Sequence, residues 1–402
     1  MLSKKSPQLR FKGFTDDWED RNLKDILREF STKSKIENEY RVLSSTNVGM
    51  EFRDGRVSGT SNLGYKIIKN GDLVLSPQNL WLGNININNI GTGLVSPSYK
   101  TFNFTDIDSS FIKPQLRTPK MLEEYKNSST QGASVVRRNL EIDSFYQIKI
   151  ATPSIKEQEK IGSFFKHLDS TISLHQRKLD LLKEQKKGYL QKMFPKNGEK
   201  VPELRFEGFA DDWEERKLSS GLREYTDRVI VEDDKEYYQI SVRNNFGGIT
   251  LRGSKMGNKI GRKRQAKINL TKYPQTLIFT RQTVEQGGIG WVDKYCDGAI
   301  VTENMPTISL DTSVFSKYFL TNLFQTRIFY KNAILDNVEG GSAQIAIHES
   351  KFLSSTLLFP NLDEQEKIGQ FFKQLDNTIT LHQRKLDLLK EQKKGFLQKM
   401  FV

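Results

Sequence analysis

Residues 157–194, EQEKIGSFFKHLDSTISLHQRKLDLLKEQKKGYLQKMF, return at residues 364–401 as EQEKIGQFFKQLDNTITLHQRKLDLLKEQKKGFLQKMF, with five substitutions in thirty-eight positions. A second repeated motif opens each half of the chain: PQLRFKGFTDDWEDR begins at Pro7 and PELRFEGFADDWEER begins at Pro202. The sequences between these motifs scarcely resemble each other. Nearly identical repeats around two different inserts indicate an internal duplication. The two variable modules are expected to recognise different targets.

Each copy of the long repeat predicts a long helix. In the first copy, Ser154 after Pro153 and Glu157 three residues later form a helix-start signal, and Pro195 and Gly198 end the helix. The second copy has Pro360, Asn361 and Glu364 at the corresponding start positions. Both helices are therefore expected to be single and uninterrupted.

Apolar side chains recur along both copies with strict 4-3 spacing, a period near 3.5 that favours coiled-coil pairing. The predicted core of the helix pair is Ile161, Phe165, Leu168, Ile172, His175, Leu179 and Leu182 in the first copy, and Ile368, Phe372, Leu375, Ile379, His382, Leu386 and Leu389 in the second. Lys186 and Lys393 continue the ladder, and we expect these side chains to extend to solvent.

The two repeats are most simply related by a pseudo-twofold axis, which runs the paired helices antiparallel. The ladder covers about 33 residues, so at ~1.5 Å per residue it is roughly 50 Å long. That length is about one and a half turns of B-DNA at ~34 Å per turn. A helix pair of this length is expected to set the spacing between two short half-sites on duplex DNA.

His175 and His382 interrupt the ladder near its middle. Antiparallel pairing would bring the two imidazoles towards each other, so a metal site or a pH-sensitive contact is one interpretation. The favoured interpretation is a polar core pair that fixes the register, as buried polar groups do in coiled coils.

The regions between the repeats predict mixed domains. Short apolar and β-branched runs separated by turn residues indicate strands at 65–77, 93–104 and 145–153, with a polar helix near 113–126. The second region has strand-like runs at 237–242, 276–282, 298–310 and 356–360, and an amphipathic helix over 314–335. The predicted fold class is α+β, with two mixed α/β recognition domains at 1–153 and 196–359 and two long antiparallel spacer helices at 154–195 and 360–402.

Composition narrows the class of partner. Lys and Arg number 62 against 49 Asp and Glu, giving a net charge of +13 and an isoelectric point near 9.4, which favours a polyanionic partner. A single cysteine, Cys296, excludes an internal disulfide framework and fits a reducing cytoplasm. The start, MLSKKSPQLRF, has no hydrophobic segment after its lysines, and no apolar run reaches membrane-spanning length, so a cytoplasmic protein is expected.

The strongest local charge signal is RGSKMGNKIGRKRQAK at 252–267, which has seven cations, three glycines and no acid. Small residues let a backbone approach phosphates, and the cations provide sequence-independent affinity through counterion release. The candidate phosphate contacts are Arg252, Lys255, Lys259, Arg262, Lys263, Arg264 and Lys267. A solvated basic loop is the alternative interpretation.

Base recognition requires side chains such as Arg, Asn or Gln that can make paired hydrogen bonds with base edges. Candidates near predicted turns are Gln78, Asn79, Gln131, Arg137 and Arg138 in the first module, and Arg243, Asn244, Asn245, Arg281, Gln282 and Gln344 in the second. The segments 129–138 and 339–348 lie at almost equal distances before their helices and are candidates for equivalent loops. Polar loop residues are common, so the argument rests on their clustering.

Signals for catalysis were not found. The sequence has no Pro-Pro dipeptide for an amino-methyltransferase site, no phosphate-binding Gly-Lys-Ser or Gly-Lys-Thr loop, no G-x-S-x-G elbow and no metal-spaced Cys/His cluster. We expect no metal site and no catalytic residue in this chain. It is predicted to recognise DNA without modifying it.

In the order of its parts, the chain resembles the specificity subunit of type I restriction-modification systems. The resemblance rests on the P-x-L-R-F-x-G-F-x-D-D-W motifs at Pro7 and Pro202 and on the helices from Glu157 and Glu364, and it covers essentially the whole chain. It implies two target recognition domains that each bind one half of a split DNA sequence, with the helices as a ruler.

The resemblance also implies partners that carry the chemistry. These are two methylation subunits that use S-adenosylmethionine to methylate adenine, and motor-nuclease subunits that require ATP and Mg²⁺ to translocate and cut DNA. The paired helices are implied to dock the methylation subunits. Trp18 and Trp213 either contribute to docking or pack within each module, which is the favoured alternative.

Two other classes of protein remain as alternatives. A twofold-like DNA-binding regulator without an associated methyltransferase would also be basic and bipartite, but the chain has no helix-turn-helix pattern. A standalone nuclease would need an acidic metal site that the sequence does not show.

Overall fold

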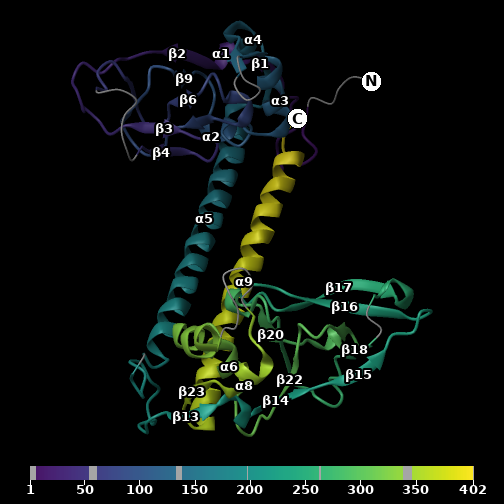
Figure 1. Cartoon of the computed structure of the whole chain (residues 1–402). Coiled ribbons are helices and arrows are strands. Elements are labelled where there is room, and N and C mark those ends of the chain that lie inside the picture. The colour runs from purple at the N-terminus through teal and green to yellow at the C-terminus, as the bar shows by residue number, and fades with distance from the viewer. Residues whose placement is uncertain are drawn as a thin grey trace. The chain divides into compact units, whose positions relative to one another are not determined.

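The computed structural model describes residues 6–53, 61–132, 138–196, 198–261, 264–337 and 346–401 of the chain (Figure 1). These residues form two compact units: unit 1 comprises 1–177 and 384–402, and unit 2 comprises 178–383. Each unit contains one variable module, the first part of the helix that follows it, and the last part of the other repeat's helix. Residues of each predicted spacer helix therefore belong to both units.

The two repeats form α5 (Ile155–Lys192) and α9 (Leu362–Lys399), each an uninterrupted helix of 38 residues. Their segments run antiparallel within each unit. In unit 1, Phe164 packs edge-to-face on Phe396 with centroids 5.0 Å apart. In unit 2, Tyr189 packs in the same way on Phe371 at 4.9 Å.

The expectation that Lys186 and Lys393 extend to solvent is wrong. Lys393 Nζ lies 2.6 Å from a carboxylate oxygen of Asp169 in unit 1, and Lys186 Nζ lies 2.7 Å from Asp376 in unit 2. Both lysines are partly buried, so an ionic partner on the facing helix offsets part of the cost of removing the ammonium from water. The two pairs occupy equivalent places in the two repeats.

The predicted core positions of the helices are all buried or half-buried. The buried ones are Ile161, Phe165, Leu168, Leu179, Leu182, Ile368, Phe372, Leu386 and Leu389; the half-buried ones are Ile172, His175, Leu375, Ile379 and His382. His175 belongs to unit 1 and His382 to unit 2, so the proposed contact between them stays a prediction.

In unit 1 the helices outside α5 and α9 are short. They are α1 (Leu23–Ile26), α2 (Ser109–Ile112), α3 (Pro119–Asn127), α4 (Ile142–Tyr146) and the 3-10 turn η1 (Leu80–Leu82). The strands are β1 (Glu19–Asn22), β2 (Leu27–Phe30), β3 (Leu43–Ser45), β4 (Met50–Phe52), β5 (Lys66–Ile68), β6 (Leu73–Leu75), β7 (Ile85–Ile87), β8 (Gly93–Val95), β9 (Lys100–Phe104), β10 (Ser129–Gln131), β11 (Arg138–Leu140) and β12 (Lys149–Thr152).

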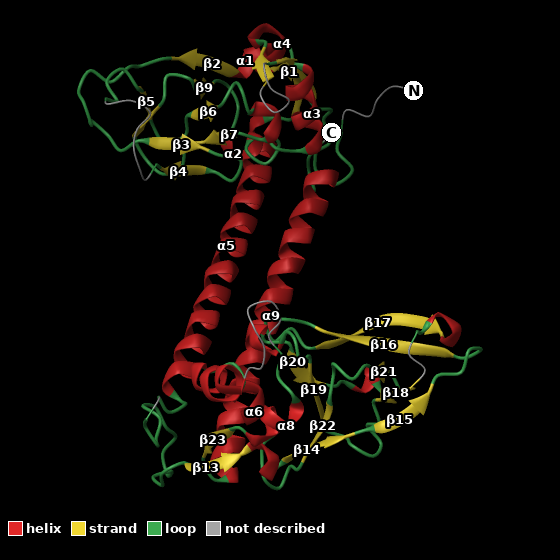
Figure 2. Ribbon diagram, in the orientation of Figure 1, coloured by secondary structure: helices red, strands yellow, loops and turns green. Residues whose placement is uncertain are grey.

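Unit 2 has a second set of short elements (Figure 2). Its helices are α6 (Lys317–Leu323), α7 (Arg327–Phe329), α8 (Glu349–Ser354), the π-helical η6 (Tyr330–Ile334) and the 3-10 turns η2 (Leu218–Ser220), η3 (Gly257–Lys259), η4 (Val284–Gln286), η5 (Lys294–Cys296) and η7 (Leu335–Asn337). Its strands are β13 (Glu214–Lys217), β14 (Leu222–Tyr225), β15 (Asp227–Ile230), β16 (Glu236–Val242), β17 (Ile249–Met256), β18 (Arg264–Lys267), β19 (Thr276–Phe279), β20 (Ile289–Trp291), β21 (Ile300–Val301), β22 (Thr307–Leu310) and β23 (Thr356–Phe359).

Each unit contains a four-stranded antiparallel sheet of the same topology, although the sequences of the two units differ. Its strand order is β2-β9-β6-β7 in unit 1 and β14-β22-β19-β20 in unit 2. The pairs β1-β12 and β13-β23 also correspond, and each joins the opening motif to the strand just before the long helix. Unit 2 adds a five-stranded sheet, β15-β18-β21-β16-β17, whereas unit 1 has the small pairs β3-β4 and β5-β8.

The single helix predicted at 314–335 is interrupted. After α6 ends at Leu323, Thr326 Oγ1 donates to the Leu323 carbonyl at 2.6 Å and accepts from Phe329 N at 3.2 Å, so it starts a new helix. In unit 1, Thr118 Oγ1 donates to Gln115 O and accepts from Met121 N in the same arrangement. Local capping by a threonine hydroxyl therefore overrides the helical periodicity.

A buried ion pair joins the opening motif to the start of each long helix. Arg10 Nε and Nη2 donate to Glu157 at 2.6 and 2.7 Å, and Arg205 binds Glu364 in the same bidentate way at 2.7 Å for both bonds. Both glutamates are 0% exposed. These hydrogen bonds raise the pKa of Arg10 and of Arg205 above the ordinary arginine value. Glu157 was expected to complete a helix cap, but its carboxylate is used to hold the arginine.

The next residue of each repeat ties the helix to its module. Gln158 Oε1 accepts from Asp108 N at 2.9 Å, and Gln365 Oε1 accepts from Ser316 N at 3.1 Å. The helix approaches the module closely here, because a Cβ atom at Gly162 would lie 2.8 Å from the backbone nitrogen of Phe111. The repeated Glu-Gln pair thus binds the opening motif with one side chain and the module with the other.

Trp18 and Trp213 are buried within their own units. Trp18 packs on Phe111 at 5.7 Å and on Phe401, the end of the other repeat's helix, at 6.3 Å. Trp213 contacts Phe319 at 5.7 Å and Phe194 at 6.1 Å in the equivalent positions. Both indoles are core residues and are therefore not available for docking a partner.

The chain returns to its start in unit 1, where the C-terminal end of α9 lies beside the opening motif (Figure 1). Leu9 N donates to Lys399 O at 2.8 Å, as Leu204 N does to Lys192 O at 2.8 Å in unit 2. Each opening motif is thus held by the end of the other repeat's helix. No helix among the described residues is long and apolar enough to cross a membrane.

Replacing Arg205 with methionine should lower the free energy of unfolding by roughly 3 kcal/mol, because Glu364 would remain buried without a counter-charge. Urea unfolding followed by tryptophan fluorescence would measure this loss. The matched control is Lys196→Met, which removes an exposed partner of Glu203 and should leave the unfolding midpoint nearly unchanged. An equal effect of both substitutions would contradict the assignment.

Candidate nucleic-acid interface

One turn has the same backbone in both variable modules. It links β6 to β7 in unit 1, at 76–85, and β19 to β20 in unit 2, at 280–289. Each turn contains a 3-10 helix whose N-cap, Asn79 or Thr283, has φ −125°, and which ends at Gly83 or Gly287 with φ 86° or 76°. A positive φ of this size favours glycine, which explains why both turns end on that residue.

The hydrogen bonds of the two turns also correspond. Ser76 N donates to Asn84 O at 3.0 Å, as Thr280 N does to Gly288 O at 2.9 Å. The glycine N–H closes each 3-10 turn by donating to Leu80 O or to Val284 O. Leu80 and Val284 are buried and anchor the turns in the cores of their units. We call residues 76–85 and 280–289 the duplicated turn.

In unit 1 the structure gathers most of the described base-contact candidates at this turn. Gln78 and Asn79 lie in it, and Gln78 O accepts from Arg138 N at 3.3 Å. Gln131 is paired with Arg138 in the β10-β11 hairpin. The Arg138 guanidinium donates from Nε to Ser129 Oγ at 2.8 Å and from Nη2 to Ser129 O at 2.9 Å, so it braces the hairpin. Arg137 lies outside the described residues.

In unit 2 the β16-β17 hairpin brings a second group to the turn (Figure 2). Asn245 and Phe246 at its tip have φ of 54° and 56°. Asn244 Nδ2 donates to Gln286 Oε1 at 2.7 Å, and Asn245 N donates to Gln286 O at 2.7 Å. The exposed Arg243 is in the same loop. The hairpin tip is therefore fixed on the duplicated turn.

Arg281 and Gln282 belong to the turn itself but differ in environment. Arg281 Nε and Nη2 donate to Glu349 at 2.9 and 2.5 Å, so its guanidinium is held by a carboxylate. Burial raises the pKa of the neighbouring Glu224, as does Glu349, and Arg281 opposes this shift. Gln282 is exposed. Gln344 lies outside the described residues, although Ile347 N, just beyond, donates to Arg281 O at 3.1 Å.

The segments 129–138 and 339–348 were expected to be equivalent loops. Residues 133–137 and 338–345 are outside the described part of the chain. The described end of each segment binds the backbone of its duplicated turn, through Arg138 in unit 1 and Ile347 in unit 2. Their equivalence as DNA-reading loops stays a prediction.

The cationic segment begins on the same hairpin. Arg252, Lys255 and Lys259 are exposed, and Arg252 is the extra residue of a bulge, since Gln239 pairs with Gly253 and Ile240 with Leu251. A bulge can redirect a side chain out of the regular alternation of a strand. Lys267 is half-buried, and its Nζ lies 3.9 Å from Asp227. Arg262 and Lys263 lie outside the described residues, and for Arg264 only the backbone is described.

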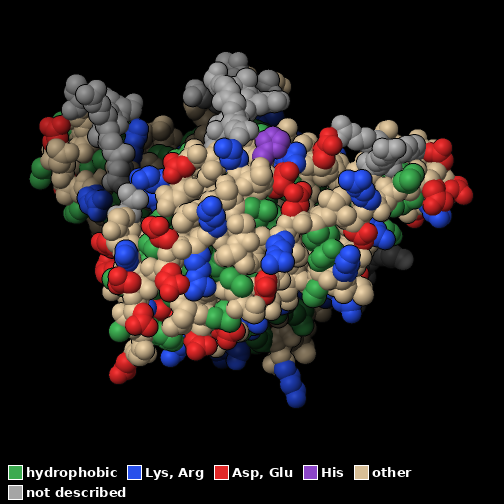
Figure 3. Space-filling model, turned by 60° about the horizontal axis from the view of Figure 1, so that its bottom comes forward, with side chains coloured by type: hydrophobic (Ala, Val, Ile, Leu, Met, Phe, Trp, Pro, Cys, Tyr) green, Lys and Arg blue, Asp and Glu red, His purple; other side chains and the backbone are tan. Residues whose placement is uncertain are grey.

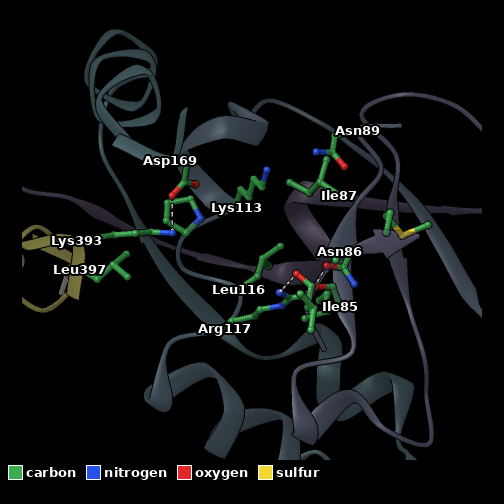
Figure 4. A pocket seen from close by; sticks show the side chains of 14 residues that line it. Ile85, Asn86, Ile87, Asn89, Lys113, Leu116, Arg117, Asp169, Lys393 and Leu397 are labelled. Atoms are coloured by element: carbon green, nitrogen blue, oxygen red, sulfur yellow. Dashed lines mark hydrogen bonds and ion pairs between the residues drawn. The ribbon is translucent and has the colours of Figure 1, made fainter. Parts of the chain in front are cut away.

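A hollow in unit 1 is lined by charged side chains that bind other parts of the same unit (Figure 4). Arg117 lines it and donates to the carbonyls of Ile85, Val48 and Thr46 at 3.1–3.2 Å and to Asn86 Oδ1. Burial lowers the pKa of this guanidinium. The Asp169–Lys393 pair forms another part of the wall. Arg117 therefore fixes the β3-β4 loop on β7, and its donors are used within the protein.

Other surfaces of the described part carry less specific signals. On the face drawn in Figure 3, Lys and Arg are interspersed with Asp and Glu and form no continuous cationic tract among the described side chains. No group of three or more His, Cys, Asp or Glu side chains that could hold a metal ion occurs within the described ranges. Cys296 is buried.

Sequence reasoning missed the duplicated turn. The signals were present as a strand, a polar turn, a glycine and a further strand, in DLVLSPQNLWLGNINI and in TLIFTRQTVEQGGIGW. Only Gln, Gly and Ile are identical at matching positions of the turns, so the similarity of backbone cannot be recognised from sequence identity alone. The sequence did identify Gln78 and Gln282, but it did not indicate that they are equivalent.

Comparison with known proteins gives one family. The model of the type I restriction modification DNA specificity domain matches residues 15–184 and 210–391. One relative is the type I restriction enzyme MjaVIII specificity subunit of Methanocaldococcus jannaschii, which is 24% identical over 294 residues. That match covers 69% of this chain and 66% of the relative, so the chain spans just under two thirds of the relative's length.

Two solved structures share the fold. The S subunit of a type I restriction-modification system from M. genitalium aligns over 99% of both chains with a TM-score of 0.59 and 12% identity. A chain from a study of complex assembly and conformational transition of the type I R-M system aligns with a TM-score of 0.53 and 13% identity, over 97% of this chain and 99% of that one. With the matched domains, these likenesses confirm the predicted α+β class with an internal repeat.

Proposed function

Because the chain belongs to the type I restriction modification DNA specificity family and carries its domain twice, we propose that it is the DNA-recognition subunit of a type I restriction-modification complex. Each unit would read one half of a bipartite target. The observation that supports this most is the duplicated turn, which stands in both units beside amide and guanidinium side chains. Groups of this kind make the paired hydrogen bonds that distinguish base edges.

The chemistry would reside in the partners. Two methylation subunits with S-adenosylmethionine would methylate adenine, and motor-nuclease subunits with ATP and Mg²⁺ would cut unmodified DNA. The chain itself would contribute no catalytic step, and the paired helices would set the spacing between the half-sites. A twofold-like regulator without a methyltransferase is not favoured, since the relative and the solved neighbour are specificity subunits.

Exposed leucines offer a docking surface for the methylation subunits. Leu174 and Leu388 in unit 1 are 62% and 52% exposed, and Leu381 and Leu181 in unit 2 are 67% and 52% exposed. Leu381 and Leu388 are the repeats of Leu174 and Leu181, so each unit displays one leucine from each helix. Apolar side chains repeatedly exposed on a polar helix surface mark an interaction site. Their occurrence once per unit fits two identical partners.

Co-expression with a cognate methylation subunit, followed by single-molecule sequencing of adenine methylation in the cell's DNA, tests the main proposal. We expect methylation at a split motif with an unread gap. Cells with the methylation subunit alone provide the control and should show no such motif. An assembled complex that adds no methylation would contradict the proposal and favour the regulator.

The double variant Arg252→Ala/Lys255→Ala should weaken binding to all DNA sequences. Losing two phosphate contacts should lower the slope of log affinity against log salt by about 2, since each contact contributes roughly 0.9. Fluorescence anisotropy at several salt concentrations measures this slope. Lys217→Ala/Arg223→Ala removes two exposed cations of the same unit from other strands and should change it little. An unchanged slope in the first variant would place the hairpin away from DNA.

The leucine surface makes a prediction about stoichiometry. Leu174→Glu/Leu388→Glu should reduce the number of bound methylation subunits from two to one, because charged side chains would be forced into an apolar contact. Native mass spectrometry of the purified complex counts the subunits. Ser173→Glu, an adjacent exposed position, should retain both. Two subunits bound to the double leucine variant would exclude this surface.

A further inference from the structure

The duplicated turn has three identities at twelve aligned positions when it is extended through β7 and β20. They are Gln78 with Gln282, Gly83 with Gly287, and Ile85 with Ile289. The fold explains two of them: the glycines adopt positive φ, and the isoleucines are 2% and 3% exposed in the cores. The fold does not explain the glutamines.

Both glutamines are exposed, and neither side-chain amide hydrogen-bonds to any described residue. Some other amides at the site do have internal partners, such as Asn244 with Gln286 and Asn86 with the Thr46 carbonyl. A side chain kept at the same position of two otherwise different turns, with no partner in the described protein, is placed for an external one.

The backbone around each glutamine is bound by segments that carry other candidate DNA contacts. In unit 1, the Gln78 carbonyl binds the backbone of Arg138, and in unit 2 the residue before Gln282 binds Ile347 N. The amide-bearing tip of the β16-β17 hairpin is fixed four and five residues after Gln282 in the unit 2 turn, at Gln286 and Gly287. Each glutamine therefore stands on a hydrogen-bonded turn that also binds the segments carrying other candidate base contacts.

We infer that Gln78 and Gln282 are matched base-reading residues, and that each recognises adenine at the corresponding position of its own half-site. A glutamine amide offers one donor and one acceptor, which complement N7 and the N6 amino group of adenine in the major groove. Equivalent backbones would present the two amides in the same way to each half-site. This inference rests on the proposed function and adds the residues and the base that they read.

The test is the methylated motif produced by Gln78→Ala and by Gln282→Ala, each co-expressed with the methylation subunit. Gln78→Ala should relax one position of one half-site, with the preference for adenine there falling about tenfold. Gln282→Ala should do the same in the other half-site. The unaltered half-site in each variant reports that the complex still folds and methylates. Gln147→Ala, an exposed glutamine of unit 1 outside the turn, should leave the motif unchanged.

Gln78→Glu distinguishes base reading from a loss of local structure. A carboxylate accepts from the N4 amino group of cytosine, so the preference at the same position should move from adenine towards cytosine. Full methylation of the original motif by both alanine variants would overturn the inference, as would relaxation of both half-sites by one substitution. If the unsubstituted chain directs no split motif, the proposed function itself fails, and this result is seen before any substitution is made.

Discussion

The buried pairs Arg10–Glu157 and Arg205–Glu364 are the constraint on which each unit depends. A carboxylate with no exposed surface must be compensated, and the bidentate guanidinium does this with fixed geometry. The arginine belongs to the opening motif and the glutamate to the start of the long helix. The pair thus fixes the beginning and the end of a variable module against each other, whatever sequence lies between them.

The same logic extends to the aromatic core. Trp18 of one opening motif packs on Phe401 from the end of α9, and Trp213 packs on Phe194 from the end of α5. A module is therefore complete only when its own helix start and the other repeat's helix end are both present. The near-identity of the repeats follows, because each copy of the helix has to serve one unit with its beginning and the other unit with its end.

The two variable modules have some elements in common and differ in others. Both keep a four-stranded antiparallel sheet, the threonine-capped helix start and the duplicated turn, whose buried residues share a hydrophobic core with the long helices in each unit. Beyond them the modules diverge: unit 2 extends β16 and β17 into a five-stranded sheet with exposed cations, and unit 1 has shorter pairs. The units therefore share a common support and differ in what they present, as two different half-sites would require.

The sequence by itself determined the helices, their antiparallel pairing, the mixed α and β modules and the family, because these rest on local periodicity and on motifs of many residues. Only the tertiary structure decided the partners of Glu157, Lys186 and Trp18, since periodicity reports which face is buried but not what covers it. The equivalence of Gln78 and Gln282 also required the structure. Backbone hydrogen bonds and a positive φ create the same turn from different side chains, so the two turn sequences share few identical residues.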